Sequence, residues 1–223
     1  MPFNPPEADK GLIPRRLRRY NVFVDTPLLC GGVVHLIGVK WMRVIAGQAK
    51  SKFLKQVPGR GTRPITDRVK ESLFNILREK VHQCRFLDLF AGTGAVGIEA
   101  LSRGAAEAVF VEKAPKAIRV LRENLRLTGM TDCARVFQED AFKFIPKSHE
   151  QFQIIYIAPP QFKNIWLKTL ILLDKHLILD PEGIIVVQIF PKEFESLSLN
   201  RYVLTDQRKY GSTMLCFYEM APD

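Results

Sequence analysis

The chain has 223 residues, of which 47% are hydrophobic and 25% charged, a composition typical of soluble globular proteins rather than of disordered or membrane-spanning chains. Its four histidines are dispersed, and its four cysteines form no C-x-x-C pair (Cys30, Cys84, Cys133 and Cys216). Neither a disulfide framework nor a metal site is therefore indicated. We expect a monomeric protein of the reducing cytoplasm that binds no metal and no membrane.

The net charge of +10 is unevenly distributed along the chain. Residues 42–85 carry eleven basic and three acidic side chains, whereas residues 86–223 carry sixteen basic and seventeen acidic ones. A surface that only confers solubility would spread its charge more evenly, so the basic segment favours binding of a polyanion. The candidate polyanion-binding residues are Lys50, Lys52, Lys55, Arg60, Arg63 and Arg68.

The first 41 residues resemble neither a folded domain nor a linker. A proline-rich start is followed by a basic run at 15–19 and by an apolar run at 27–39, which is too short to span a bilayer. Basic-then-apolar order is typical of signal peptides, but no small-x-small cleavage site follows. We interpret residues 1–41 as a poorly ordered leader that can be deleted without loss of folding, and Met42 as a candidate for the original start.

Residues 42–80 predict a basic hairpin followed by a helix. The runs 43–47 and 52–57 are β-prone, and residues 58–64 form a basic loop rich in glycine and proline. Thr66 or Asp67 can cap a helix that extends to about Lys80, with apolar residues along one face. We expect residues 42–80 to be the polyanion-binding segment and residues 81–223 to be the main domain.

The stretch from Phe86 to Gly104 predicts a ligand site. Residues 86–90 read as a strand buried on both faces, residues 92–94 as a tight turn and residues 95–103 as a helix. A strand that enters a helix through glycines brings backbone N–H groups and a helix N-terminus against a ligand. Asp88, at the strand end, is expected to point into the same crevice. The pattern therefore indicates a nucleotide-type cofactor.

The identity of that cofactor is open from the glycine pattern alone. Gly92-x-Gly94-x-x-Gly97 also fits the dinucleotide fingerprint, and Glu112 lies 20 residues beyond Gly92. A carboxylate before the glycines, however, attracts the cationic amino group of a methionine moiety and repels a pyrophosphate. This favours S-adenosylmethionine over a nicotinamide dinucleotide.

The rest of the chain alternates between strands and helices. Strands are expected at 108–112, 134–138, 153–157 and 184–189, and helices at 115–128, from 141 to about 145, and 164–176. A turn is expected at 180–183, and the runs 202–205 and 214–219 are expected to close the sheet as an antiparallel pair. This alternation predicts an α/β fold: a Rossmann-like, doubly wound, mostly parallel sheet with a small N-terminal hairpin extension.

Ligands of such sheets bind beyond the carboxyl ends of the strands, and the candidate residues fall there. Glu112 is placed to accept from two ribose hydroxyls, while Asp140 and the Ala141 N–H are placed to contact an adenine. The expected cofactor-binding residues are Asp88, Phe90, Gly92, Thr93, Gly94, Glu112, Lys113, Asp140 and Ala141.

Three blocks of the chain resemble one family. The segment starting Met42-Arg-Val-Ile-Ala-Gly, the block Arg63-Pro-Ile-Thr-Asp-Arg-Val-Lys-Glu-Ser-Leu-Phe-Asn75 and the stretch Phe86–Ala105 are similar to the RsmD-type 16S ribosomal RNA guanine-N2 methyltransferases. The resemblance covers about residues 42–220. It implies a class I methyltransferase domain at residues 81–223, with S-adenosylmethionine as cofactor. It also implies methylation of a guanine exocyclic amine in small-subunit RNA or an assembling particle, which makes RNA the expected polyanion and Lys50, Lys52, Lys55, Arg60, Arg63 and Arg68 of the 42–80 segment the expected RNA-binding residues.

The acceptor loop departs from that family. Class I amino-methyltransferases carry Asp/Asn-Pro-Pro-aromatic where this chain has Ala158-Pro159-Pro160-Gln161, followed by Phe162. We expect all five residues to form the catalytic loop, with the Gln161 amide oxygen replacing the missing acid and Phe162 stacking on the flipped base. Two alternatives are a catalytically silent RNA-binding paralogue and a DNA amino-methyltransferase.

Overall fold

The computed structural model describes residues 42–57 and 65–222. The predictions for the leader at 1–41, for the loop at 58–64, and for Arg60 and Arg63 within it lie outside the described residues. Over the described ranges, no helix has both the length and the apolar character that a membrane span requires.

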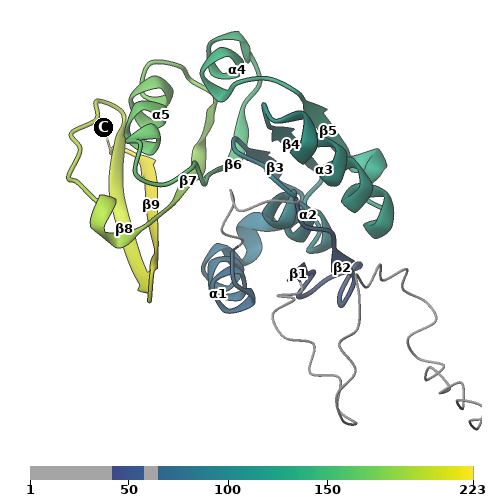
Figure 1. The fold of residues 1–223 in the computed structure, drawn as a ribbon. Helices are drawn as coiled ribbons and strands as arrows, with labels where there is room; N and C mark the ends of the chain where they lie inside the picture. Colours follow the sequence, from purple (N-terminus) through teal and green to yellow (C-terminus); the bar gives the residue numbers. More distant parts are fainter. Residues whose placement is uncertain (1–41, 58–64, 223) are drawn as a thin grey trace, which may run out of the picture. The chain divides into compact units, whose positions relative to one another are not determined.

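A seven-stranded sheet in the order β5-β4-β3-β6-β7-β9-β8 forms the centre of the fold (Figure 1). Strands β5, β4, β3, β6 and β7 pair parallel with one another, whereas β9 pairs antiparallel with both β7 and β8. The strands are β3 (Arg85–Asp88), β4 (Glu107–Val111), β5 (Ala134–Phe137), β6 (Phe152–Ile157), β7 (Leu179–Ile189), β8 (Tyr202–Tyr210) and β9 (Thr213–Met220). The predicted doubly wound sheet with an antiparallel closing pair is confirmed.

Helices cover both faces of this sheet. Thr66 caps α1 by accepting from the Val69 N–H, and Pro115 starts α3, which ends at Gly129 with a φ of 76°. The helices are α1 (Asp67–Leu77), η2 (Arg78–Val81), α2 (Ala95–Ser102), α3 (Pro115–Thr128), η3 (Thr131–Cys133), α4 (Ala141–Lys147), α5 (Ile165–Leu173) and η4 (Pro191–Glu193).

The core has two parts, one on each side of the sheet. Phe86 packs in the cluster that contains residues of α1, α2 and α3, whereas its neighbour Leu87 packs in the cluster of α4 and α5. Successive side chains of a strand point to opposite faces, so a continuous apolar run fits a strand that is covered twice. This is why residues 86–88 read correctly as a buried strand.

Residues 42–57 share this core. Strands β1 (Met42–Arg43) and β2 (Phe53–Leu54) form a two-residue antiparallel pair, shorter than the predicted runs. Met42, Val44 and Leu54 are buried in the same cluster as α1 and α2. The described residues belong to one compact unit, and residue 80 marks no break in the core.

The turn predicted at 180–183 is wrong, because these residues lie within β7. Phe152 pairs with Leu179 but Ile154 pairs with Ile184, so the extra residues form an irregularity within the strand. Asp180 still makes turn-like bonds there, with one carboxylate oxygen accepting from the Glu182 N–H at 3.0 Å and the other from the Gln153 amide at 3.0 Å. The Asp180 side chain therefore makes the hydrogen bonds expected of a turn, although residues 180–183 belong to a strand.

Several element ends also differ from the predictions, among them that of β3, which ends at Asp88 and not at the predicted residue 90. Helix α1 ends at Leu77 and is followed by η2, with Arg78 at a φ of 44°. Helix α5 ends at Leu173, before the predicted His176, and β8 extends five residues beyond the predicted Thr205 to Tyr210. Helix and strand ends depend on tertiary contacts more than element interiors do.

Candidate active site

A cavity of about 950 Å³ opens at the carboxyl ends of β3, β4 and β6. The chain proceeds from β3 outward to β4 and β5 and then returns to β6 on the other side of β3, so this is the switch point of the sheet. The volume is in the range of small-molecule sites. The predicted residues that line it are Asp88, Phe90, Gly92, Thr93, Glu112, Lys113, Asp140, Ala141 and Ala158 to Gln161.

Asp88, the last residue of β3, supplies a buried carboxylate to this cavity. Its side chain is 2% exposed, and among the described residues its Oδ1 has no hydrogen-bond partner. Burial raises the pKa of Asp88 to about 7, the charge of Glu112 adds to the effect, and the backbone N–H groups of Gly97 and Phe90 partly oppose it. A buried carboxylate with one oxygen that has no hydrogen-bond partner within the described ranges is suited to bind a cationic group.

Glu112, directly after β4, is held in place by backbone donors. Its Oε2 accepts from the Gly92 N–H at 2.9 Å and its Oε1 from the Ala114 N–H at 2.8 Å. Each carboxylate oxygen keeps a second lone pair that a hydroxyl group can use. The carboxylate therefore links the glycine turn to the end of the neighbouring strand.

The glycine turn requires glycine for two different reasons. Gly92 has a φ of 54°, and a Cβ there would meet nothing within 4 Å. Gly94 has a φ of 77° and caps α2, and a Cβ there would lie 2.2 Å from a methyl carbon of Leu121. Gly94 therefore packs against the side chain of Leu121 in the core, whereas Gly92 lines the cavity.

Asp140, the predicted adenine contact, already accepts a hydrogen bond from this protein with each of its carboxylate oxygens. It is the N-cap of α4, where its Oδ1 accepts from the Phe142 N–H at 2.9 Å. Its Oδ2 accepts from the Lys113 Nζ at 3.3 Å, an ion pair at the surface. Its neighbour Ala141 is buried and lines the cavity.

The acceptor loop, residues 158–162, follows β6, and its last residue differs from the other four in position. Ala158 to Gln161 line the cavity, but Phe162 does not: its side chain is 66% exposed and its ring lies 5.4 Å from that of Phe190. Glu193 is buried and accepts from the backbone N–H groups of both Phe162 and Phe190. Phe162 thus lies outside the cavity in which a flipped base was expected to stack on it.

Tyr156 and Gln188 are among the cavity-lining residues that were not predicted from the sequence. The Tyr156 hydroxyl donates to the Gln188 Oε1 at 2.6 Å, and both residues line the cavity. Burial, together with the charge of Asp88, raises the pKa of Tyr156 well above its usual value. A signal was present, because Gln188 is the single polar residue in the apolar run 184–189.

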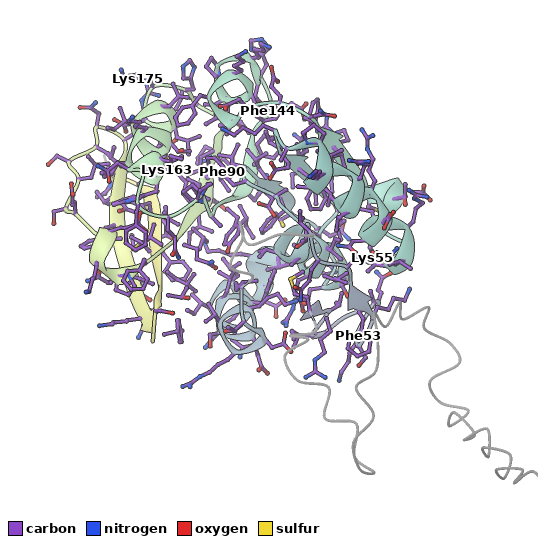
Figure 2. The ribbon with its side chains drawn as sticks, viewed as in Figure 1. Phe53, Lys55, Phe90, Phe144, Lys163 and Lys175 are labelled. Atoms are coloured by element: carbon purple, nitrogen blue, oxygen red, sulfur yellow. The ribbon has the colours of Figure 1, made fainter. Side chains whose placement is uncertain are left out.

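The structure separates the described basic residues into two pairs. The Lys52 Nζ donates to the Thr128 carbonyl at 3.0 Å, and the Lys55 Nζ pairs with Glu123 at 2.8 Å, so both contact α3. Lys50 and Arg68 are exposed. In Figure 2 the labelled Lys55 and Phe53 lie at the hairpin. Lys163, a cation outside the predicted segment, lines the cavity, as does Phe90.

No group of three or more His, Cys, Asp or Glu side chains within residues 42–57 and 65–222 is arranged to hold a metal ion.

The strand order, the helices on both faces and the cavity beyond β3 and β4 define a class I methyltransferase fold. A solved structure titled "Putative methyltransferase yhhF from Escherichia coli" matches 81% of this chain and 98% of its own, with a TM-score of 0.73 and 31% identity. The comparison confirms the fold class predicted from the sequence.

The chain belongs to the family described as conserved hypothetical protein 95, whose model matches residues 42–219. Its relatives include the "Putative rRNA methyltransferase YlbH" of Bacillus subtilis, 39% identical over 80% of this chain and 98% of the relative. The ribosomal RNA small subunit methyltransferase D of Haemophilus influenzae is 35% identical over 80% of this chain and 93% of the relative. The predicted membership of the RsmD-type family is confirmed.

Proposed function

We propose that this protein transfers a methyl group from S-adenosylmethionine to the exocyclic amine of a guanine in small-subunit ribosomal RNA. One observation carries the proposal: three acids at successive strand ends surround a cavity that continues to the Ala158–Gln161 loop. The names of the RsmD-type relatives support ribosomal RNA as the substrate. Ribosomal RNA, which the names of these relatives give as their substrate, supports the cytoplasm as the place of action.

The residues of the cavity fit S-adenosylmethionine. The partnerless Oδ1 of Asp88 suits a cationic amino group, and the remaining lone pairs of Glu112 suit ribose hydroxyls. Asp140 and Ala141 remain the proposed adenine contacts, with Phe90 and Lys113 beside them. When bound, the cofactor supplies a methyl group on a sulfonium, so the protein needs no activated nucleophile and mainly orients the acceptor.

The acceptor loop would orient the guanine amine. Its lone pair is delocalised into the ring, and hydrogen-bond acceptors on both N–H groups can turn it toward attack. Ala158 has no side-chain acceptor, so we propose that a backbone carbonyl of the Pro159-Pro160 pair and the Gln161 amide oxygen take these roles. A neutral amide stabilises the positive charge that develops on nitrogen less than a carboxylate would.

The basic N-terminal segment is proposed to bind the RNA backbone. Val57 and Ile65, the described residues on either side of the 58–64 loop, both line the cavity. This continuity supports an RNA path from the segment to the acceptor loop. Charge reversal at Lys50 and Arg68 should lower the log–log salt slope of RNA binding by about 0.7–0.9 for each phosphate that the variant no longer binds. Reversal of Glu182, an exposed charge within β7, serves as the matched control.

Methylation mapping tests the function. Small-subunit RNA from cells with and without the gene is digested, and N2-methylguanosine is quantified at each site by mass spectrometry. The proposal expects one guanine to lose its methyl group in the deletion and to regain it with the wild-type gene, but not with the Asp88→Ala, Glu112→Ala double variant. Identical maps in both strains, with RNA binding retained, would instead support the silent RNA-binding paralogue.

A further inference from the structure

Phe162 is displayed to solvent in an unfavourable backbone conformation. Two thirds of its side chain is exposed, the largest exposed fraction among the large hydrophobic residues described. Its φ of 59° lies in the left-handed region, which bulky residues rarely occupy. Such conformations persist only where the surrounding structure enforces them, and they concentrate at functional sites. Neither hydrophobic burial nor backbone preference accounts for this placement.

A buried acid and a second ring hold Phe162 in place. The carboxylate of Glu193 accepts from the Phe162 N–H with one oxygen and from the Phe190 N–H, at 3.3 Å, with the other. The Phe190 ring packs against the Phe162 ring at 5.4 Å and an angle of 51°. The exposed ring is therefore supported from behind and fixed in position.

The ring lies beside the cavity and not inside it. The four residues before Phe162 and the residue after it, Lys163, line the cavity, whereas Phe162 does not. Lys163 and Lys192, next to Glu193, are exposed and have no ion pair with any residue in the described ranges. An exposed aromatic ring next to unpaired cations, at the edge of a cavity, has the chemistry of a nucleotide-binding surface.

We propose that Phe162, supported by Phe190 and flanked by Lys163, is a stacking platform for the nucleotide next to the target guanine in single-stranded RNA. This inference rests on the proposed function. A base that leaves its stack to enter the cavity exposes the face of its neighbour, and an aromatic ring can replace the missing stacking partner. Lys163 would bind the phosphate that joins the two nucleotides. An apolar protein partner would need a larger contiguous apolar patch than one ring.

Steady-state kinetics on in vitro transcribed small-subunit RNA tests the platform. Base–aromatic stacking contributes about 1–3 kcal/mol, so Phe162→Ala should raise the RNA KM about 5- to 150-fold and change kcat far less. Phe162→Tyr should restore the KM. Phe162→Gly should raise the KM equally without losing stability, since glycine accepts the positive φ. Leu177→Ala, at an exposed leucine elsewhere, should have no effect.

The salt dependence of RNA binding separates the ring from the cation. Lys163→Gln should lower the log–log salt slope by about 0.7, the value for one phosphate contact on a single strand. Phe162→Ala should weaken binding at every salt concentration and leave the slope unchanged. Equal slopes for wild type and Lys163→Gln would remove Lys163 from the platform and overturn the proposal in this form.

The outcomes distinguish the platform from the proposed function. If wild type methylates the RNA and Phe162→Ala keeps its KM, the platform is refuted and the function stands. If Phe162→Ala instead loses kcat at unchanged KM, the ring contacts the target base and the platform is equally refuted. If wild type does not methylate small-subunit RNA, the proposed function fails. Binding of a fluorescein-labelled single-stranded RNA then decides the platform, and equal affinity of wild type and Phe162→Ala refutes it.

Discussion

On the proposed function, the pKa of Asp88 should link cofactor binding to pH, and calorimetry can measure this link. With a pKa of about 7, roughly half of the ligand-free protein carries the ionised carboxylate at pH 7.0, and only about 3% carries it at pH 5.5. The cationic amino group of S-adenosylmethionine should bind the ionised form, and this amine stays protonated over the range because its ordinary pKa is about 7.7–8.0. Affinity should therefore fall about 15-fold between pH 7.0 and pH 5.5.

Titration calorimetry in two buffers of different ionisation enthalpy provides the assay. Binding should release about half a proton at pH 7.0 and nearly one at pH 5.5, because the proposed contact with the amino group requires Asp88 to be ionised in the complex. Asp88→Asn should bind more weakly at pH 7.0 and lose most of the pH dependence. A wild-type affinity that is flat over this range, or an equal pH dependence in Asp88→Asn, would refute the role assigned to this carboxylate.

The same shift predicts how stability changes with pH in the ligand-free protein. The folded-state pKa of Asp88 lies above the ordinary value of 3.8, so its contribution is fully present below pH 3.8 and is lost as pH rises toward about 7. Asp88→Asn should therefore unfold at a higher urea concentration than wild type at pH 8 and show no such gain at pH 3.5. A gain of equal size at both pH values would mean that ionisation is not its cause.

Three further predictions concern the support of the site. Gly47→Ala should lower the free energy of unfolding by at least about 2 kcal/mol, because the new Cβ would lie 1.6 Å from the Ser102 carbonyl oxygen. The control Gly211→Ala also has a positive φ but open space around the new Cβ, so it should cost only about 1 kcal/mol. Equal urea midpoints for the two variants would contradict this prediction. Gln161→Ala should lose about 10²-fold in single-turnover methylation at unchanged cofactor affinity, and a wild-type rate would mean that backbone carbonyls suffice. Glu99→Gln should cost about 3–5 kcal/mol, measured by urea unfolding, because this buried carboxylate pairs with two cations and two backbone N–H groups; an unchanged midpoint would exclude that role.

The last of these predictions concerns how the N-terminal segment is attached. The Glu99 oxygens accept from the Ile45 and Ala46 N–H groups at 2.8 and 3.0 Å and pair with Lys70 and Arg103. Burial lowers the pKa of Lys70, although the charge of Glu99 opposes that effect. Glu99 belongs to α2, the helix that follows the glycine turn, so its bonds to Ile45 and Ala46 tie the hairpin segment to that helix.

The sequence by itself determined the elements whose causes are local. The apolar run before Asp88, the glycines at 92 and 94 and the proline at 115 act through backbone conformation and neighbouring side chains, and the predicted strand, turn and helix formed there. The parallel arrangement follows from strand–helix alternation. Because parallel strands share one carboxyl edge, that arrangement was enough to place Asp88, Glu112 and Asp140 around one cavity.

Only the tertiary structure decided how far each side chain is buried and which distant residue it contacts. Gln188 meets Tyr156 across 32 positions of the chain, and Glu193 fixes the Phe162 backbone across 31. The raised pKa of Asp88 comes first from desolvation, which depends on every element packed around it. Side-chain direction in a loop is likewise set by such contacts, and for that reason Phe162 lies outside the cavity although the four residues before it lie within.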